Sequence, residues 1–162
     1  MNVTRVFIHG LESSSQGTKG VYFQHRYPDM IVEDYPGSFD ERMIKLNRLL
    51  SGEKDLILVG SSYGGLMASV FTCTNEERVT KLILLAPALN LEEFGPYLDK
   101  KIVVPVVVYH GKNDDVVPVA PVQDIARTVF ANISYHVIDD DHSLHSNFPS
   151  LDWDTLLDSG GN

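Results

Sequence analysis

The sequence predicts an α/β fold, a doubly wound three-layer sandwich in which helices cover both faces of a parallel sheet. Short apolar runs typical of strands alternate along the chain with longer segments of helical periodicity. The strand expected at residues 81–85 is nearly all apolar, as in a strand that is covered on both faces. A glycine-rich turn at residues 60–65 joins an apolar strand directly to an apolar helix, so these two elements are expected to pack against each other.

Three strands and three helices are expected in the first half of the chain. Apolar runs at residues 3–8, 30–33 and 56–59 predict the strands. After the first strand, a loop of small and polar residues leads into a helix through Tyr22, Phe23 and Tyr27. Pro36-Gly37 turns the chain, and the apolar side chains of residues 40–50 fall on one face of a 3.6-residue period. The third helix follows the glycine-rich turn, through residues 66–71.

The second half of the chain continues the alternation. Residues 81–85, 103–109 and 133–138 are the fourth, fifth and sixth expected strands, and residues 120–130 form a helix before the last of them. Residues 149–157 are expected to close the fold as a helix with Leu151, Trp153 and Leu156 facing inward, before a frayed tail at residues 159–162. Since no repeat, linker or low-complexity segment interrupts this pattern, residues 1–162 are expected to form a single domain.

The turn between the third strand and its helix predicts a nucleophilic serine. Gly60-x-Ser62-x-Gly64 is the pattern of a nucleophile elbow, in which a serine at the tip of a strained turn is tolerated because its neighbours are small. Ser61 does not fit the pattern, because it would need glycines at Val59 and Tyr63. The alternative is a glycine-rich turn with a bystander serine, so an acid and a base are needed elsewhere to support the interpretation.

An aspartate and a histidine follow two later strands, where a parallel sheet gathers its functional residues. Ligands of such sheets bind at the carboxyl ends of the strands. The fifth strand ends at residues 110–118, which include Asp114, and the sixth ends at residues 139–145, which include His142. The candidates therefore occur in the order Ser, Asp, His, which is the order of the triad in α/β-hydrolases.

On these residues, the chain resembles the α/β-hydrolase superfamily, specifically its small members with little or no cap, such as short bacterial serine esterases. His9-Gly10-Leu11 resembles the oxyanion loop, and residues 60–65 match the elbow. Residues 110–118 resemble the recurring H-G-x-x-D-x-x-V-P segment, which makes Asp114 the matching acid, and Asp141-His142 resembles the D-H pair of the last strand. The first two strands of a full-length member have no counterpart. The resemblance implies a six-stranded parallel sheet in the order 2-1-3-4-5-6.

The resemblance implies a serine esterase that cleaves small carboxylic esters or thioesters through an acyl-serine intermediate, without a cofactor. Ser62 would attack, His142 would accept its proton, and Asp114 would orient the imidazole. The backbone N–H groups of Leu11 and Tyr63 would stabilise the oxyanion. A non-catalytic binding module on the same fold, or an acyltransferase or perhydrolase with the same triad, remains an alternative.

Several of these residues have a second interpretation. Asp114 and Asp115 suit a turn, and His142 could be a solvated loop residue, with His145 as the rival base. His9 and His110 are favoured as loop-shaping residues. The acidic run before His142 is favoured as a solvated turn rather than a metal site, because no second cluster supplies ligands at familiar spacing.

The connection after the fourth strand is the expected source of substrate contacts. Residues 87–101 are too few for a lid, but they can supply a lip or merely pack on the sheet. The lip would come from Leu89, Leu91, Phe94 and Tyr97. An open site of this kind favours small acyl groups over long lipid chains. The residues expected to contact substrate are His9, Gly10, Leu89 and Phe94.

Composition excludes several classes of partner. With 43% hydrophobic and 22% charged residues in 162, the chain is typical of a globular protein. A net charge of −9 argues against nucleic acid and anionic lipid, and no apolar run is long enough to span a membrane. Cys73, the one cysteine, needs no oxidising compartment, and no export signal precedes the first strand, so a cytoplasmic location is expected. The oligomeric state is left open.

Overall fold

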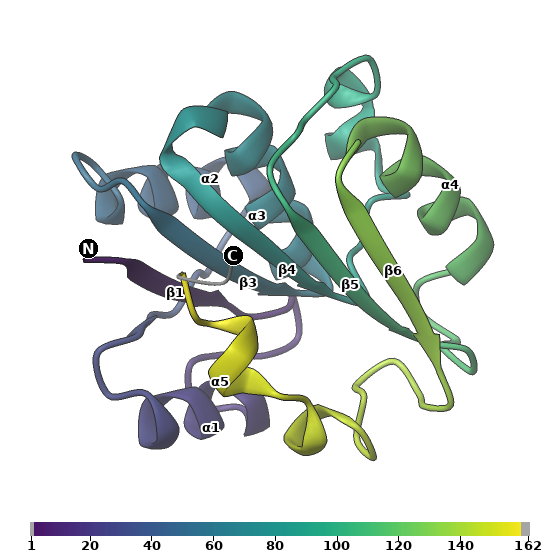
Figure 1. Ribbon diagram of the computed structural model, residues 1–162, viewed down its shortest axis with the longest axis horizontal. Helices are drawn as coiled ribbons and strands as arrows, with labels where there is room; N and C mark the ends of the chain where they lie inside the picture. Colours follow the sequence, from purple (N-terminus) through teal and green to yellow (C-terminus); the bar gives the residue numbers. More distant parts are fainter. Residues whose placement is uncertain (1, 160–162) are drawn as a thin grey trace.

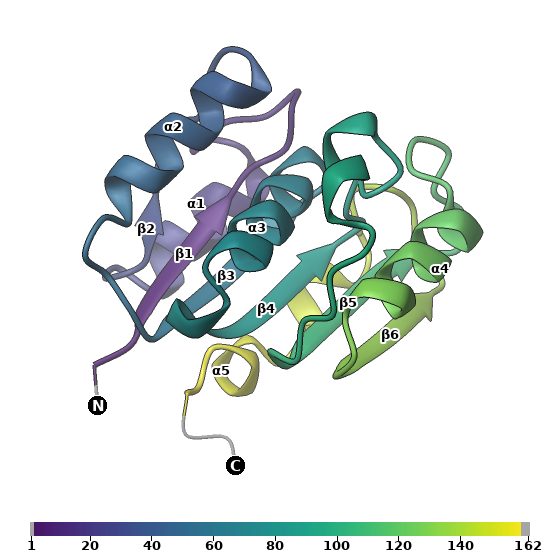
Figure 2. The same ribbon diagram turned by 90° about the horizontal axis from the view of Figure 1, so that it is seen from above.

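Six parallel strands form one sheet in the computed structural model, which describes residues 2–159 (Figure 1). Their order is β2-β1-β3-β4-β5-β6, so the predicted order 2-1-3-4-5-6 is confirmed. Figure 2 shows the twisted sheet from above, with its labelled strands running in one direction. The strands are β1 (Thr4–Ile8), β2 (Ile31–Val32), β3 (Leu56–Ser61), β4 (Val79–Leu85), β5 (Val106–Gly111) and β6 (Ile133–Ile138).

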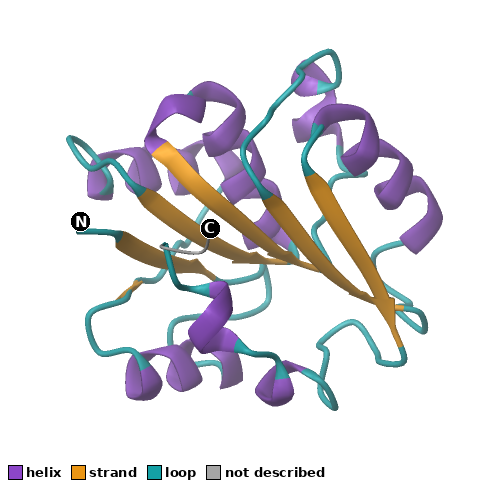
Figure 3. Ribbon diagram, in the orientation of Figure 1, coloured by secondary structure: helices purple, strands orange, loops and turns teal. Residues whose placement is uncertain are grey.

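Helices cover both faces of this sheet, as Figure 3 shows, and produce the predicted three layers. One face carries α2 (Phe39–Leu49), α3 (Tyr63–Thr74) and α4 (Val119–Val129), whose apolar side chains share a core with β1, β3, β4 and β5. The other face carries α1 (Thr18–Arg26) and the short α5 (Trp153–Leu156). There, the Phe23 ring packs edge to face against Trp153, and its centre lies 5.0 Å from the centre of the Phe7 ring.

The central strand β3 and the helix α3 that packs on it are buried, because other elements cover both. The first five residues of β3 are buried, and so is each residue of α3 from Tyr63 to Cys73. Burial raises the pKa of the Cys73 thiol to about 12, so this buried thiol stays protonated at neutral pH. At the periphery, α2 begins with a capping box in which Ser38 and Glu41 exchange side-chain-to-backbone hydrogen bonds.

Two predicted elements differ from the structure. The fifth strand was expected at residues 103–109, but β5 begins at Val106, since Pro105 lacks a backbone N–H and only an isolated bridge from Ile102 to Phe130 precedes it. The closing helix expected at residues 149–157 divides into the 3₁₀ turn η3 (Phe148–Ser150) and α5, which Asp152 caps by accepting a hydrogen bond from the Thr155 N–H. Of the frayed tail, residues 160–162 lie outside the described residues.

The carboxyl ends of β1, β3, β4, β5 and β6 meet at one edge of the sheet, because all the strands are parallel. The loops that leave this edge carry the residues singled out by the sequence. Within residues 2–159, no helix combines the length and the apolar character that a membrane span needs, and the longest, α3, has 12 residues.

Candidate active site

Ser62 stands on the turn between β3 and α3 with a strained backbone. Its φ of 56° and ψ of −114° lie where residues other than glycine are rarely found. Hydrogen bonds hold this conformation: the Ser62 N–H donates to the carbonyl of Leu85 at 2.8 Å, and the Ser62 carbonyl accepts from the N–H groups of Gly65 and Ala88. The end of β4 and the chain after it therefore brace the turn.

Two glycines of the turn are required by close packing. A Cβ at Gly60 would collide with the backbone of Gly64, which belongs to the first turn of α3. A Cβ at Gly64 would collide with the carbonyl groups of Ile8 and His9 at the end of β1. The Gly60-x-Ser62-x-Gly64 pattern thus reflects the narrow space between the strand end and α3.

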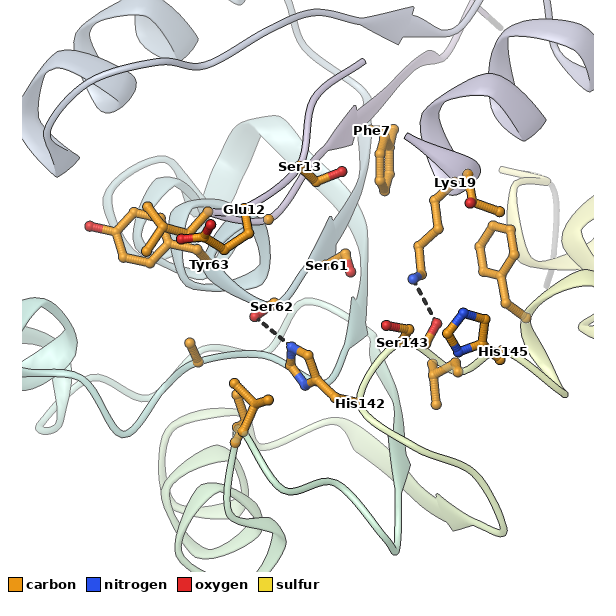
Figure 4. A pocket seen from close by; sticks show the side chains of 18 of the residues that line it. Phe7, Glu12, Ser13, Lys19, Ser61, Ser62, Tyr63, His142, Ser143 and His145 are labelled. Carbon is orange, nitrogen blue, oxygen red and sulfur yellow. Dashed lines mark hydrogen bonds between the residues drawn. The ribbon is translucent and has the colours of Figure 1, made fainter. Parts of the chain in front are cut away.

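A chain of hydrogen bonds joins Ser62, His142 and Asp114. The Nε2 atom of His142 lies 3.1 Å from the Ser62 Oγ, and its Nδ1 lies 2.7 Å from the Asp114 Oδ2 (Figure 4 shows the serine and the histidine). Because a carboxylate only accepts, Nδ1 carries the proton, which leaves Nε2 to accept the hydroxyl proton of Ser62. The structure brings these three sequence-predicted residues together from the ends of β3, β5 and β6.

Asp114 is a buried carboxylate whose oxygens are all engaged. Its side chain is fully buried, and Oδ1 accepts hydrogen bonds from the N–H groups of Val116 and Val117, both at 2.8 Å. Burial by itself would raise the pKa of Asp114, but the hydrogen bonds from His142, Val117 and Val116 outweigh it and hold the pKa below 3.8. The carboxylate therefore stays ionised at neutral pH.

His110 is a further partner of Asp114 that sequence reasoning assigned only to loop shaping. Its Nε2 lies 3.1 Å from the Val117 carbonyl and 3.2 Å from the Asp114 Oδ2, so this nitrogen carries a proton. Its Nδ1 lies 2.6 Å from the Tyr135 hydroxyl. Burial lowers the pKa of His110 more than Val117 and Asp114 raise it, so the ring is neutral and Tyr135 donates to Nδ1. The signal that could have predicted this contact is the H-G-x-x-D segment, which places His110 four residues before Asp114.

The loop that carries His142 is held by Asp140. This carboxylate is buried, and it accepts hydrogen bonds from the N–H groups of Asp141, Ser146 and Asn147 and from the Asn147 side chain. Asp141 instead accepts from both the backbone and the ring of His145. The acidic run thus shapes the loop, and no three metal-ligating side chains gather among residues 2–159.

The expected oxyanion donors are the backbone N–H groups of Leu11 and Tyr63. Each residue lines the same cavity as Ser62, and neither N–H has a hydrogen-bond partner within the described part of the chain. His9 positions the first of them: the buried His9 ring accepts a hydrogen bond from the Tyr35 N–H at Nε2, and Nδ1 donates to the Gly10 carbonyl. Burial lowers the pKa of His9, consistent with this neutral tautomer.

A cavity of about 670 Å³ opens beside the Ser62 hydroxyl. Apolar side chains form much of its wall, and Leu11, Leu91 and Val116 are exposed at its rim. Polar groups also line it, including Glu12, Lys19 and the serines at positions 13, 61 and 143. The remaining lining residues are Phe7, Gly10, Thr18, Tyr63, Ala88, Asn90, Val117, His142, Leu144, His145, Phe148 and Pro149.

Three of the four residues expected to contact substrate do not line this cavity. Leu89 and Phe94 were expected at its lip, but both are buried in the core, where the 3₁₀ turn η2 (Glu92–Tyr97) packs on α3. His9 is buried behind the loop that it holds, so only Gly10 lines the cavity. The connection after β4 mainly packs on the sheet, where most of its apolar residues are buried, and it contributes Ala88, Asn90 and Leu91 to the cavity wall.

Comparison with known families identifies the fold. The family model described as alpha/beta hydrolase fold matches residues 9–102, more than half of the chain. No curated protein matches the sequence.

Solved structures agree with this match at the level of the fold. An alpha/beta hydrolase enzyme from the metagenome of lagoon sediments at Mar Chica, Morocco, is 21% identical, with 97% of this chain and 89% of that chain covered at a TM-score of 0.70. A monoacylglycerol lipase of Paleococcus ferrophilus is 16% identical, with 96% and 94% covered at 0.71. An esterase of Pyrococcus furiosus is 16% identical, with 96% and 80% covered at 0.73.

Proposed function

The chain belongs to the alpha/beta hydrolase fold family, and on that premise we propose that it is a serine hydrolase of small carboxylic esters or thioesters. The observation that supports this proposal most strongly is the hydrogen-bonded series Ser62, His142 and Asp114 beside a cavity. The esterase and the monoacylglycerol lipase among the similar structures support an ester substrate.

In the first proposed step, the Ser62 oxygen attacks the ester carbonyl while His142 Nε2 takes its proton. The 3.1 Å between these atoms is within reach for the transfer. The imidazolium that forms keeps its hydrogen bond to the ionised Asp114, 2.7 Å away, which stabilises its charge. His142 then returns the proton to the leaving oxygen or sulfur, and an acyl-serine remains. Water, activated by the same histidine, hydrolyses that acyl-serine.

The oxyanion of each tetrahedral intermediate is proposed to lie between the N–H groups of Leu11 and Tyr63. Neither donor has a hydrogen-bond partner among residues 2–159, so no partner has to be exchanged when charge develops on the oxygen. The Tyr63 N–H is the first of helix α3, so the positive end of the helix dipole adds to its effect.

Covalent labelling with a fluorophosphonate probe tests the proposal. Intact-mass spectrometry should show one adduct on the parent protein and none on Ser62→Ala. The neighbouring Ser61→Ala is the matched control, because it removes a hydroxyl from the same cavity and should still be labelled. If the parent is not labelled at all, or Ser62→Ala still is, the assignment fails and a non-catalytic binding module becomes the better interpretation.

A further inference from the structure

Lys19 places a positive charge in the wall of the cavity that holds Ser62 and His142. It belongs to the first turn of α1, and its side chain is only partly exposed. Figure 4 shows its ammonium group directed into the cavity from the wall opposite Tyr63 and Glu12. None of the proposed catalytic steps uses this residue.

The ammonium group has donors to spare. Its Nζ donates to the backbone carbonyl of Ser143 at 2.7 Å and lies 5.5 Å from the centre of the Phe148 ring. A lysine has three N–H donors, so two remain for a ligand. Within residues 2–159, no carboxylate forms an ion pair with Lys19.

The nearest acidic residues do not neutralise this lysine by contact. Asp140 and Asp141 favour its charged form, but the oxygens of Asp140 are occupied by the N–H donors of its own loop, and Asp141 is bound to His145. The Lys19 side chain is only partly exposed, and this burial lowers the pKa of its ammonium group. A cation in that state gains more from an anionic ligand than an exposed lysine does.

The surroundings suit a carboxylate. The hydroxyls of Ser61 and Ser143 line the same cavity, and neither forms a hydrogen bond within the described residues. Apolar walls from Phe7, Leu144 and Phe148 lie in the same cavity, so a short carbon chain can be buried between the ester and its charge. Because the protein has a net charge of −9, its overall charge repels anions, and Lys19 supplies a local positive charge that can bind one.

We propose that Lys19 binds a carboxylate of the substrate, so that the site prefers esters which carry a negative charge over neutral esters of the same size. This inference rests on the proposed function for its chemistry. The alternative is that Lys19 only braces the loop of His142 through the Ser143 carbonyl. A brace would affect charged and neutral substrates equally, and this difference separates the two.

Paired substrates test the proposal in two arms. In the first, mono-4-nitrophenyl glutarate carries the carboxylate on its acyl part and 4-nitrophenyl pentanoate is the neutral match. In the second, 4-butyryloxybenzoate carries it on the alcohol part and its methyl ester is the match. The parent should prefer the charged ester in at least one arm, which also shows on which part the carboxylate lies. A preference for the neutral ester in both arms overturns the proposal.

Variants of Lys19 give the second readout. Lys19→Met should raise KM for the preferred charged ester about tenfold to a hundredfold, the loss expected for a hydrogen bond to a charged group, with kcat little changed. In the same variant, KM for the neutral ester should change less than about threefold. Lys19→Arg should retain part of the preference. Lys101→Met is the matched control, because Lys101 also donates to a backbone carbonyl, that of Thr128, at the amino end of β5 and away from the cavity. Equal losses on both esters in Lys19→Met overturn the proposal.

Direct binding separates this inference from the proposed function. Calorimetric titration of Ser62→Ala with monobutyl glutarate and with its methyl ester requires no turnover. Tighter binding of the charged compound that disappears in the Ser62→Ala, Lys19→Met double variant supports the role of Lys19 even if hydrolysis is never observed. Equal binding of both compounds to Ser62→Ala overturns it, whether or not the parent hydrolyses esters.

Discussion

At the scale of single residues, Asp114 is the most constrained group of the site. Its two oxygens accept hydrogen bonds from His142, Val116 and Val117, and His110 Nε2 lies 3.2 Å from Oδ2. The bonds from His142, Val117 and Val116 lower the pKa of Asp114 and outweigh the effect of burying its side chain completely. The arrangement therefore fixes both the charge of the aspartate and the direction in which it holds the His142 ring.

Removing any one of Ser62, Asp114 and His142 should reduce kcat by about 10⁴ or more, because the three act as one unit. Combining two of the changes should cost little beyond the first, for the same reason. Steady-state kinetics on Ser62→Ala, Asp114→Asn, His142→Ala and the double variants would measure both effects. Additive losses would contradict a common role.

The neighbouring histidine and aspartate provide the matched controls. His145→Ala and Asp115→Asn should stay within about tenfold of the parent, a change of roughly 1.4 kcal/mol in the barrier. The His145 ring is hydrogen-bonded to Asp141 rather than to Ser62, and Asp115 is exposed. An inactive His145→Ala beside an active His142→Ala would exchange the two roles.

At the scale of elements, the loop after β6 determines where His142 lies. It has no regular secondary structure of its own before η3, and Leu144 adopts a positive φ of 56° within it. Its shape depends on the buried Asp140, which gathers three backbone N–H groups and the Asn147 amide. Asp140, which does not line the cavity, thus positions the loop that carries His142.

Asp140→Ala should lower both stability and activity. It leaves the N–H groups of Asp141, Ser146 and Asn147 without acceptors, so the free energy of unfolding should fall by about 2 kcal/mol or more, and kcat should fall as His142 loses its position. Asp139→Asn is the control, because the Asp139 side chain is 82% exposed and makes only peripheral contacts. Urea denaturation and ester kinetics on both variants would test this, and equal effects would contradict it.

At the scale of the whole molecule, two neutral histidines are buried beneath the loops of the site. His9 contacts the chain after β2, with Arg42, Asp34 and Lys45 nearby, and His110 contacts Tyr135 on β6 and Asp114. Burial lowers the pKa of both below the ordinary value of 6.5.

Stability should therefore fall with acidification below neutrality. Because the folded-state pKa values are lowered, the unfolded chain binds more protons than the folded protein just below pH 6.5, so the contribution to stability is complete above that pH and is lost as the pH falls. The free energy of unfolding in urea, measured from about pH 7.5 to about pH 5.0, should decrease, and His110→Gln should reduce the slope. His136→Gln, at an exposed position of β6, should not. A slope that His110→Gln leaves unchanged would contradict this account.

Access to the cavity depends on several segments of the chain, because its lining residues come from different loops. The connection between β4 and β5 mainly packs on the sheet and contributes only Ala88, Asn90 and Leu91 to the cavity wall, so we expect it to leave the opening uncovered. Esters from acetyl to hexanoyl should be preferred, without interfacial activation. Values of kcat/KM along a series of 4-nitrophenyl esters would check this, and a rise that continues beyond decanoyl would show that longer chains find a trough.

The amino-acid sequence by itself located the strands, because each is a short apolar run, and the resemblance to the α/β-hydrolase superfamily implied the order in which they pair. It also indicated that Ser62, Asp114 and His142 follow different strands of one parallel sheet. Local patterns were enough here because strands, turns and the glycine-rich elbow depend on residues close together in the chain.

Tertiary structure alone decided which side chains face the cavity. Leu89, Phe94 and Leu91 have the same apolar character in sequence, yet two are buried in the core and one reaches the rim, because their direction depends on how η2 packs against α3. The hydrogen bond between His110 and Tyr135 and the bond from the Lys19 ammonium to the Ser143 carbonyl likewise join segments distant in sequence. Such contacts arise from packing between elements, and no local pattern encodes them.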